Sequence, residues 1–178
     1  MQPEQRIYAM ITFRKARVLR FLGHLDVVRT MERAIRRAGL PVAYSQGFSP
    51  SPQMSFASAL PLGTAGEGEV CAIRLERVVD ARELHDALAA QLPADLGLVD
   101  VRVIEHGKRK LYADLKIAEY EVELQPTDAV SADDLANAVD SVIGAGDLRV
   151  MRETKSRTRE VDIRPGIRSL CAVPADED

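Results

Sequence analysis

The chain is poor in the features that most directly reveal a function, namely cysteine, aromatic residues and long apolar runs. It contains two cysteines and no tryptophan, and aromatic residues make up 4% of its 178 residues. So few aromatic side chains argue against a broad stacking platform for single-stranded RNA, although they leave phosphate binding open. No segment approaches the roughly 18–20 apolar residues that a membrane-spanning helix needs, and the amino terminus lacks the apolar core of a signal peptide. We therefore expect a cytoplasmic protein without membrane contact.

The cysteines and histidines form no pattern that is typical of a metal site. Cys71 and Cys171 lie far apart, so they provide neither a zinc knuckle nor the CxxxCxxC motif of an iron–sulfur cluster. Each lies in a short apolar run, which predicts two small core residues. His24, His85 and His106 share no metal-ligand spacing, and no Ser/His/Asp or Cys/His arrangement is recognisable. We expect no cofactor, and these absences disfavour an independent enzyme.

Charge is distributed unevenly along the chain. Residues 1–60 contain nine Lys or Arg and three acids, whereas residues 61–150 contain nine Lys or Arg and eighteen acids. The net charge of −3 therefore hides a basic amino-terminal end. Such an end is suited to face a polyanion.

The period of the apolar residues predicts a strand and then a helix at the start of the chain. Residues 7–19 begin with the alternation of a strand, and residues 24–39 change to a helical period. The expected apolar face of this helix consists of Val28, Met31, Ile35 and Ala38. Gly39, just before Leu40 and Pro41, is a typical helix stop.

Shorter patterns complete a first unit over residues 1–106. Apolar pieces at 54–57, 69–76 and 96–105 are predicted as strands, and Asp80 is expected to cap a helix over 81–92. The order strand–helix–strand–strand–helix–strand folds naturally as a ferredoxin-like α+β sheet with both helices on one face. We expect that fold here.

A basic connector at 107–112 is expected to lead to a second unit over residues 113–178. There we predict a strand at 114–126, a helix with Ser131 as its N-cap, and two further strands. These elements repeat the opening of the first unit. The second unit is therefore interpreted as an incomplete ferredoxin-like unit with a frayed acidic tail.

Four arginines and one loop form the main candidate site. Opposite the apolar face of the first helix lie Arg29, Arg33, Arg36 and Arg37. Guanidinium groups grip phosphates bidentately, but a solvated helix face or a surface for an acidic protein explains the same pattern. The candidate residues of the following loop are Gln46, Phe48, Ser49 and Ser51. Phe48 is interpreted either as a residue that stacks on a base or plugs a partner's pocket, or as one that folds back onto the sheet.

Two further features are candidates. His24 opens the first helix, where a histidine can act as general base on a ribose hydroxyl, with Arg20 or Arg29 as the stabilising cation. Its simpler role is to cap or wedge the start of the helix. Lys155, Arg157 and Arg159 alternate, so on a strand they would point to one face and form a second basic stripe.

Two stretches carry a family resemblance: HLDVVRTMERAIRRAGLPVAYSQGFSPSPQMSFASALPLG (24–63) and TKSRTREVDIRPGIRSL (154–170). Together they resemble the signatures of the radical SAM-linked proteins, also called the DUF2344 family, over roughly residues 6–173. The resemblance implies a bacterial cytosolic protein that works beside a radical SAM protein with a B12-binding-type domain. The loop departs from the usual pattern at Ser49, Ser51 and Gln53, which weakens a phosphate clamp based on side-chain charge. The tandem architecture is also similar to that of RAMP-type RNA-binding proteins.

We therefore predict a non-catalytic accessory module of a radical SAM enzyme, which binds structured RNA or presents another substrate to its partner. A metal-independent endoribonuclease with His24 as general base is the second hypothesis. The third is a protein–protein adaptor, in which the same arginines meet acidic residues of the partner.

Overall fold

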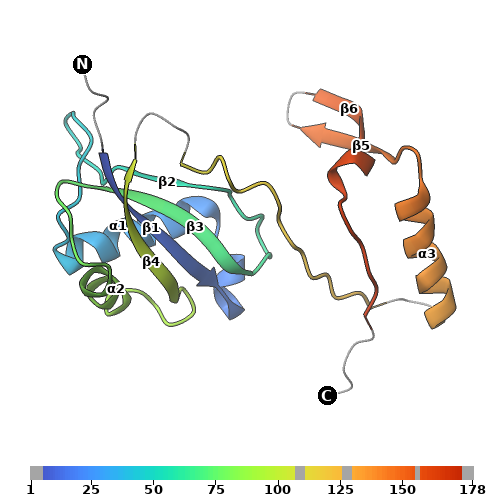
Figure 1. The fold of residues 1–178 in the computed structure, drawn as a ribbon, viewed down its shortest axis with the longest axis horizontal. Coiled ribbons are helices and arrows are strands. Elements are labelled where there is room, and N and C mark those ends of the chain that lie inside the picture. Colours follow the sequence, from blue (N-terminus) through green and yellow to red (C-terminus); the bar gives the residue numbers. More distant parts are fainter. Residues whose placement is uncertain (1–5, 107–110, 126–129, 155–156, 174–178) are drawn as a thin grey trace. The chain divides into compact units, whose positions relative to one another are not determined.

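The computed structural model describes residues 6–106, 111–125, 130–154 and 157–173, and the chain divides into two units, Met1–Ala118 and Glu119–Asp178 (Figure 1). The first unit has the elements β1 (Arg6–Lys15), α1 (His24–Ala38), β2 (Met54–Phe56), β3 (Gly66–Leu75), α2 (Ala81–Ala89) and β4 (Leu98–His106). Their order is the one that the sequence predicted. A short 3-10 helix, Arg17–Phe21, follows β1, so the first strand ends earlier than residue 19.

The four strands of the first unit form one antiparallel sheet in the order β2-β3-β1-β4. The central strand β1 pairs with both β3 and β4, so Ile11 lies opposite Cys71 on one side and Val101 on the other. The chain is therefore an α+β protein, as predicted. In Figure 1 the two helices lie against this sheet, and the buried faces of both contribute to a single core.

That core is built from alternate residues of the strands. Ala9, Ile11 and Phe13 of β1 are buried, and the same alternation buries Cys71, Ile73 and Leu75 of β3. From α1 the buried residues are Val27, Met31, Ala34 and Ile35. The predicted face was thus partly wrong, because Val28 and Ala38 lie at its margins and are only half-buried.

The ends of the helices follow from local chemistry. Gly39 ends α1 in the left-handed region with φ of 62°, which glycine adopts without steric cost. Asp80 caps α2, because its carboxylate accepts hydrogen bonds from the backbone amides of Arg82 and Glu83, both at 3.0 Å. Both predicted boundaries are confirmed.

Tyr112 ties the segment after β4 to the sheet. Its hydroxyl accepts a hydrogen bond from the backbone amide of Ala72 on β3 (2.9 Å) and donates to the backbone carbonyl of Ser55 on β2. Ser55 and Ala72 are direct partners in the ladder, so the hydroxyl lies where the two strands pair. Of the predicted basic connector 107–112, residues 107–110 lie outside the described residues.

The second unit contains α3 (Ala132–Gly144), the hairpin of β5 (Arg149–Thr154) and β6 (Arg157–Asp162), and a short 3-10 helix (Arg164–Gly166). Ser131 caps α3, as the sequence predicted, and the structure adds a capping box with Asp134. The hydrogen bonds from Ser131 lower the pKa of the Asp134 carboxyl. Within its described residues this unit has no fully buried side chain.

The strand predicted at 114–126 is wrong for the residues that the structure describes. Residues 115–125 form no strand, although their alternation is typical of one. Tyr120, Val122 and Leu124 are 71%, 71% and 70% exposed, so no neighbouring surface covers the apolar row. An alternating pattern forms a strand only where another strand satisfies its backbone. A second ferredoxin-like unit is therefore not confirmed.

The two cysteines differ in their surroundings. Cys71 is fully buried in β3, as predicted, and burial raises the pKa of its thiol to about 12. Cys171 is exposed, so its prediction as a core residue was wrong. It lies in a described stretch, 167–173, that has no regular secondary structure to shield it. Across the described ranges, no helix is both long enough and apolar enough to span a membrane.

Candidate functional site

The four arginines of α1 all lie exposed on one side of the helix, but they have different partners. Arg29 forms an ion pair with Asp26, with 3.2 Å between Nη1 and Oδ1. The other three donate to backbone carbonyls: Arg33 to Arg29 at 3.2 Å, Arg36 to Pro50 at 3.3 Å and Arg37 to Gln91 at 2.8 Å. A neutral carbonyl does not cancel a charge, and each guanidinium has further N–H donors to offer.

Two of these arginines contact different parts of the first unit. Arg36 reaches the loop that follows α1, whereas Arg37 reaches the carboxyl-terminal end of α2. Among the described residues Arg36 forms no ion pair with Glu32, which lies four residues before it, and it donates to the Pro50 carbonyl instead. The ion pair of Arg29 is exposed, and such pairs contribute only about 0–1 kcal/mol, so a phosphate can displace it at little cost.

The loop Ser45–Ser51 is a closed turn with Phe48 at its tip, and we call it the Phe48 loop. Its two ends are joined by the backbone bond from Ser45 N to the Ser51 carbonyl (2.9 Å) and by the bond from Ser51 N to Ser45 Oγ (3.1 Å). Gly47 supports the turn with a φ of 137°, which side-chain-bearing residues rarely adopt. The side chain of Phe48 is fully exposed at 110% of its reference area, so it does not fold back onto the sheet.

The Phe48 loop and α1 are directly connected. The Arg36 guanidinium bonds the carbonyl of Pro50, which is two residues after Phe48. This contact places a cation and an aromatic tip in one local structure, as the sequence suggested. Ser49 is exposed beside Phe48, whereas the Ser51 hydroxyl faces that of Ser45 at 3.3 Å and serves to close the loop.

A hollow of about 520 Å³ adjoins the same loop. Gln46 of the loop lines it together with Tyr44, Gln53 and Arg74. The side chains of Gln53 and Arg74 are positioned by hydrogen bonds, because Gln53 donates to the Tyr44 carbonyl (2.9 Å) and accepts from Arg74 (3.1 Å). Amide and guanidinium groups held in this way are suited to hydrogen-bond the edge of a base or another planar polar group.

His24 lies at a second, much smaller hollow. Its ring packs edge-on against Phe56, with 5.1 Å between centroids, and the hollow is also lined by Lys15, Ser58 and Glu69. Lys15 is only 2% exposed and donates to the Leu22 carbonyl at 3.0 Å. The volume is about 10 Å³, which is room for about one water molecule and not for a ribose.

The remaining predicted residues do not join these sites. Arg20 stacks over the ring of its neighbour Phe21, with 4.8 Å from the guanidinium carbon to the ring centroid. Arg157 and Arg159 lie on β6 in the second unit, where they share one face of the hairpin. Lys155 lies outside the described residues. No group of three His, Cys, Asp or Glu side chains is positioned to hold a metal ion in the parts of the chain that are described.

Three features were missed from the sequence, although a signal existed for two of them. Lys15 follows Ala9, Ile11 and Phe13 in the same alternation, so the sequence could have predicted that its side chain lies on the buried face of β1. Arg152 shares the face of Arg157 and Arg159, as a hairpin register would have shown. The hollow beside Gln46 depends on long-range pairing of Gln53 with Arg74, for which the sequence carries no local signal.

By fold, the chain is an α+β protein whose first unit is a four-stranded antiparallel sheet with two helices. By site, it carries a cationic helix next to an exposed aromatic loop. The chain belongs to the DUF2344 family, described as an uncharacterized protein conserved in bacteria, whose model matches residues 9–176. No curated protein and no solved structure matches it significantly.

Proposed function

We propose that this protein is a non-catalytic accessory module that binds structured RNA and presents it to a radical SAM enzyme with a B12-binding-type domain. The enzyme partner is supported by the family resemblance alone. RNA binding is supported by the geometry of the first unit. The observation that carries the proposal is the fully exposed ring of Phe48 on a closed loop that is bonded to Arg36.

Physical reasons favour an unpaired base as the contact of Phe48. Contact of water with an entirely exposed aromatic ring is unfavourable, so a partner that covers the ring lowers the free energy. Stacking of a base on such a ring contributes about 1–3 kcal/mol, and unpaired bases in RNA loops are the ones free to stack. The arginines of α1 would hold the flanking phosphates, and the hollow at Gln46 would take the edge of a neighbouring base.

The ferredoxin-like interpretation of the first unit belongs to the same proposal. Its strand order β2-β3-β1-β4, with a helix after β1 and another after β3, is consistent with a split βαβ arrangement. In that arrangement RNA would approach the first unit at the Phe48 loop. The similarity to RAMP-type proteins rests on architecture only and adds no residue to the site.

The test measures binding of a fluorescently labelled bacterial tRNA mixture to the full chain by anisotropy. Phe48→Ala is expected to weaken binding roughly 5- to 150-fold, the equivalent of one lost stack. Tyr120→Ala is the matched control, because Tyr120 is also exposed but lies in the second unit. Equal affinities of the two variants would overturn the role of Phe48.

The arginines are tested in the same assay. Arg33→Gln with Arg36→Gln is expected to weaken binding and to flatten its salt dependence by about 0.7 per lost phosphate contact on a single strand. Arg82→Gln is the control, since Arg82 is an exposed arginine of α2. Binding that is equally strong at low and high salt contradicts phosphate contacts.

The endoribonuclease remains a second candidate because of one observation, the burial of Lys15 beside His24. A buried ammonium near a histidine is the pair that base catalysis on a ribose would use. The small volume of that hollow favours the non-catalytic function. Cleavage of the tRNA mixture by the wild type, lost in His24→Ala with binding retained, would establish the enzyme; no cleavage by the wild type removes it.

A pure adaptor is distinguished by co-purification with the radical SAM protein. If the complex survives nuclease treatment and the tRNA mixture does not bind, the arginines of α1 serve an acidic protein surface instead.

A further inference from the structure

The two faces of the β5–β6 hairpin differ in the charges that they carry and in the partners of those charges. Residues that lie opposite each other in an antiparallel pair point to the same face, and the faces alternate along each strand. One face carries the pairs Arg149–Asp162, Met151–Glu160 and Glu153–Thr158. The other carries the pairs Val150–Val161, Arg152–Arg159 and Thr154–Arg157, and we call it the arginine face.

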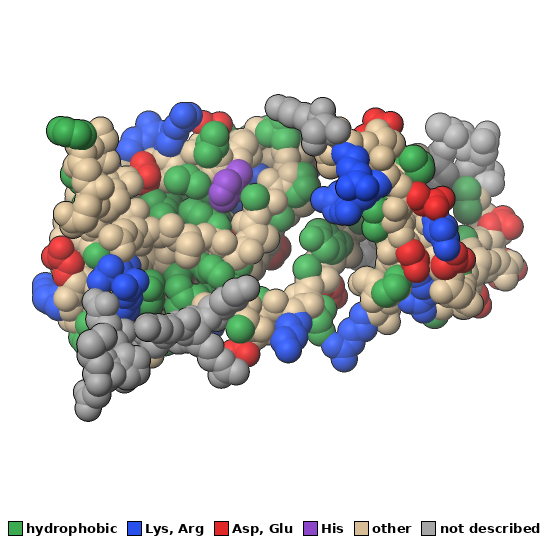
Figure 2. Space-filling view, turned by 90° about the horizontal axis from the view of Figure 1, so that it is seen from above, with side chains coloured by type: hydrophobic (Ala, Val, Ile, Leu, Met, Phe, Trp, Pro, Cys, Tyr) green, Lys and Arg blue, Asp and Glu red, His purple; other side chains and the backbone are tan. Residues whose placement is uncertain are grey.

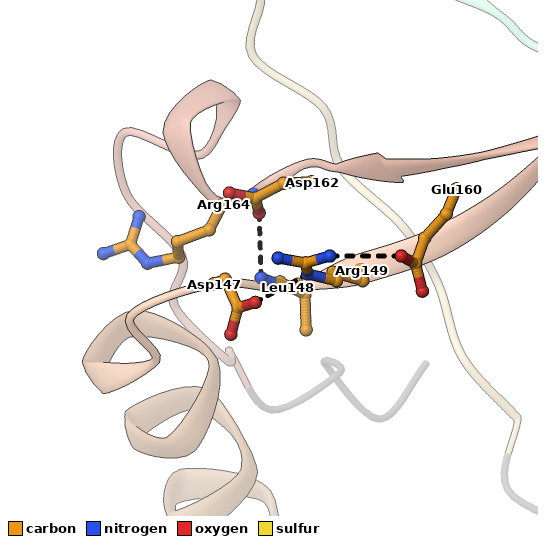
Figure 3. Close-up of polar contacts among 6 residues, drawn as sticks. All are labelled: Asp147, Leu148, Arg149, Glu160, Asp162 and Arg164. Carbon is orange, nitrogen blue, oxygen red and sulfur yellow. Dashed lines mark hydrogen bonds and ion pairs between the residues drawn. The ribbon is translucent and has the colours of Figure 1, made fainter.

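On the first face, the arginine is paired with acids of the same unit (Figure 3). Arg149 bonds the carboxylates of Asp147 at 2.8 Å and Glu160 at 3.2 Å, which raises the pKa of its guanidinium. The Asp162 carboxylate accepts from the backbone amides of Leu148 (2.9 Å) and Arg164 (3.0 Å), which lowers its pKa. The charges of Arg149, Glu160 and Asp162 therefore each have a partner in the same unit.

The arginine face has the opposite character. It has three guanidinium groups and no acid, and Arg152 lies directly across from Arg159. Like charges that face each other across two strands destabilise the pair. Among the described residues, none of the side chains of Arg152, Arg157 and Arg159 has a hydrogen bond or an ion pair, although Arg149 and Arg164 of the same unit do.

We infer that the arginine face binds two successive phosphate groups of a single nucleic-acid strand. An oxyanion between Arg152 and Arg159 relieves their repulsion and accepts from both guanidinium forks. Arg157 is two residues from Arg159 on β6, roughly 6.6 Å along the strand, so it is placed for the next phosphate of an extended chain. No aromatic residue shares the face, so it is suited to contact the backbone and not the bases.

The arginine face would attract a nucleic acid only at short range. Residues 119–178 contain seven Lys or Arg and fourteen acids, so the second unit as a whole repels a polyanion. Binding must then come from direct contacts with the three guanidinium groups. The inference extends the proposed RNA function to a separate unit, and it rests on that function only for the identity of the nucleic acid.

The test titrates a labelled twelve-nucleotide oligo(U) RNA with the full chain and follows anisotropy between 50 and 300 mM KCl. On a single strand, each phosphate contact contributes about 0.7 to the slope of log K against log salt. The double variant Arg152→Gln with Arg159→Gln removes the two arginines that share one phosphate, so it is expected to reduce the slope by about 0.7. The charge-matched control, Arg82→Gln with Arg168→Gln, removes two exposed arginines elsewhere and is expected to leave the slope unchanged. Circular dichroism checks that both variants fold.

The outcomes separate this inference from the proposed function. If the hairpin variant matches its control while Phe48→Ala still weakens tRNA binding, the arginine face is overturned and the proposed function stands. If the slope falls as expected and Phe48→Ala has no effect on tRNA binding, the arginine face is supported and the proposed role of Phe48 is overturned. A wild type that does not bind oligo(U) overturns the inference outright.

Two further arms test the source of the anion. Thermal stability is compared in inorganic phosphate and in chloride at equal ionic strength, because free phosphate offers the same chemistry. Phosphate stabilisation that disappears in the hairpin variant, with an unchanged oligo(U) slope, assigns the face to free phosphate and overturns the nucleic-acid inference. Displacement of oligo(U) by a hexaglutamate peptide at equal charge concentration would instead indicate an acidic protein partner and also overturn it.

Discussion

Replacing Tyr112 with phenylalanine removes one hydroxyl that connects β2, β3 and the segment after β4. The hydroxyl accepts from the amide of Ala72 and donates to the carbonyl of Ser55, and it also lies 3.0 Å from the Ser55 side-chain oxygen. The ring itself is unchanged by the substitution, so packing is preserved. The effect therefore measures the hydrogen bonds alone.

The expected magnitude follows from those bonds. Each contributes a net of roughly 0.5–1.5 kcal/mol, so the loss of two costs about 2 kcal/mol of the free energy of unfolding. For a unit of this size, that loss lowers Tm by roughly 8 °C. Ala72 is only 1% exposed, so water cannot easily replace the lost partner of its amide.

The pH dependence provides a second readout. Burial raises the pKa of the Tyr112 phenol, which keeps it protonated in the folded unit at a pH where the unfolded chain ionises. The stabilisation is therefore complete below about pH 10 and is lost as the pH rises through the raised pKa. The phenylalanine variant lacks this alkaline loss.

Urea unfolding followed by far-UV circular dichroism measures the difference. Tyr120→Phe is the matched control, because the same chemical change is made on a side chain that is 71% exposed. We expect Tyr120→Phe to lie within about 0.5 kcal/mol of the wild type. If Tyr112→Phe is no less stable than Tyr120→Phe, the hydroxyl does not hold the sheet as described.

Three further predictions concern the caps, the thiols and the hairpin. Asp80→Ala should lower the free energy of unfolding by about 1 kcal/mol through the lost cap, whereas Asp86→Ala on the exposed face of α2 should cost less than about 0.5; equal losses in urea unfolding would contradict the capping role. A thiol reagent should modify exposed Cys171 at once and buried Cys71 only in denaturant, and two fast thiols in the native protein would contradict the burial. Because its pKa is lowered on folding, Asp162 stabilises the hairpin above about pH 3.9 and this support is lost as the pH falls through the lowered value; Asp162→Asn should remove that acid transition in amide exchange.

Local signals in the sequence predicted the first unit well. The switch of apolar period at residue 24, the glycine at 39 and the aspartate at 80 each act within a few residues, so the elements that they delimit could be read directly.

The second unit shows where such reading stops. Residues 115–125 have the pattern of a strand, but a strand also needs a neighbour, and the pattern does not specify one. Cys171 was misplaced for the same reason, since a short apolar run predicts burial only if another surface covers it. Hydrophobic side chains visible at the surface in Figure 2 illustrate that apolar composition alone does not fix burial.

The sequence predicted which residues form the candidate site, but not the contacts that they make. The arginines of α1 and the loop tip at Phe48 were identified, because residue type and spacing place them. Their partners were not, because the bonds from Arg36 to Pro50 and from Arg37 to Gln91 join segments that are distant in the sequence.

The uncovered row of Tyr120, Val122 and Leu124 has a consequence for the behaviour of the protein in solution. Extended apolar segments with free backbone groups tend to aggregate by adding to the edge strands of other molecules. Glu119, Glu121 and Glu123 interleave this row with negative charge, and they act as gatekeepers against such self-association.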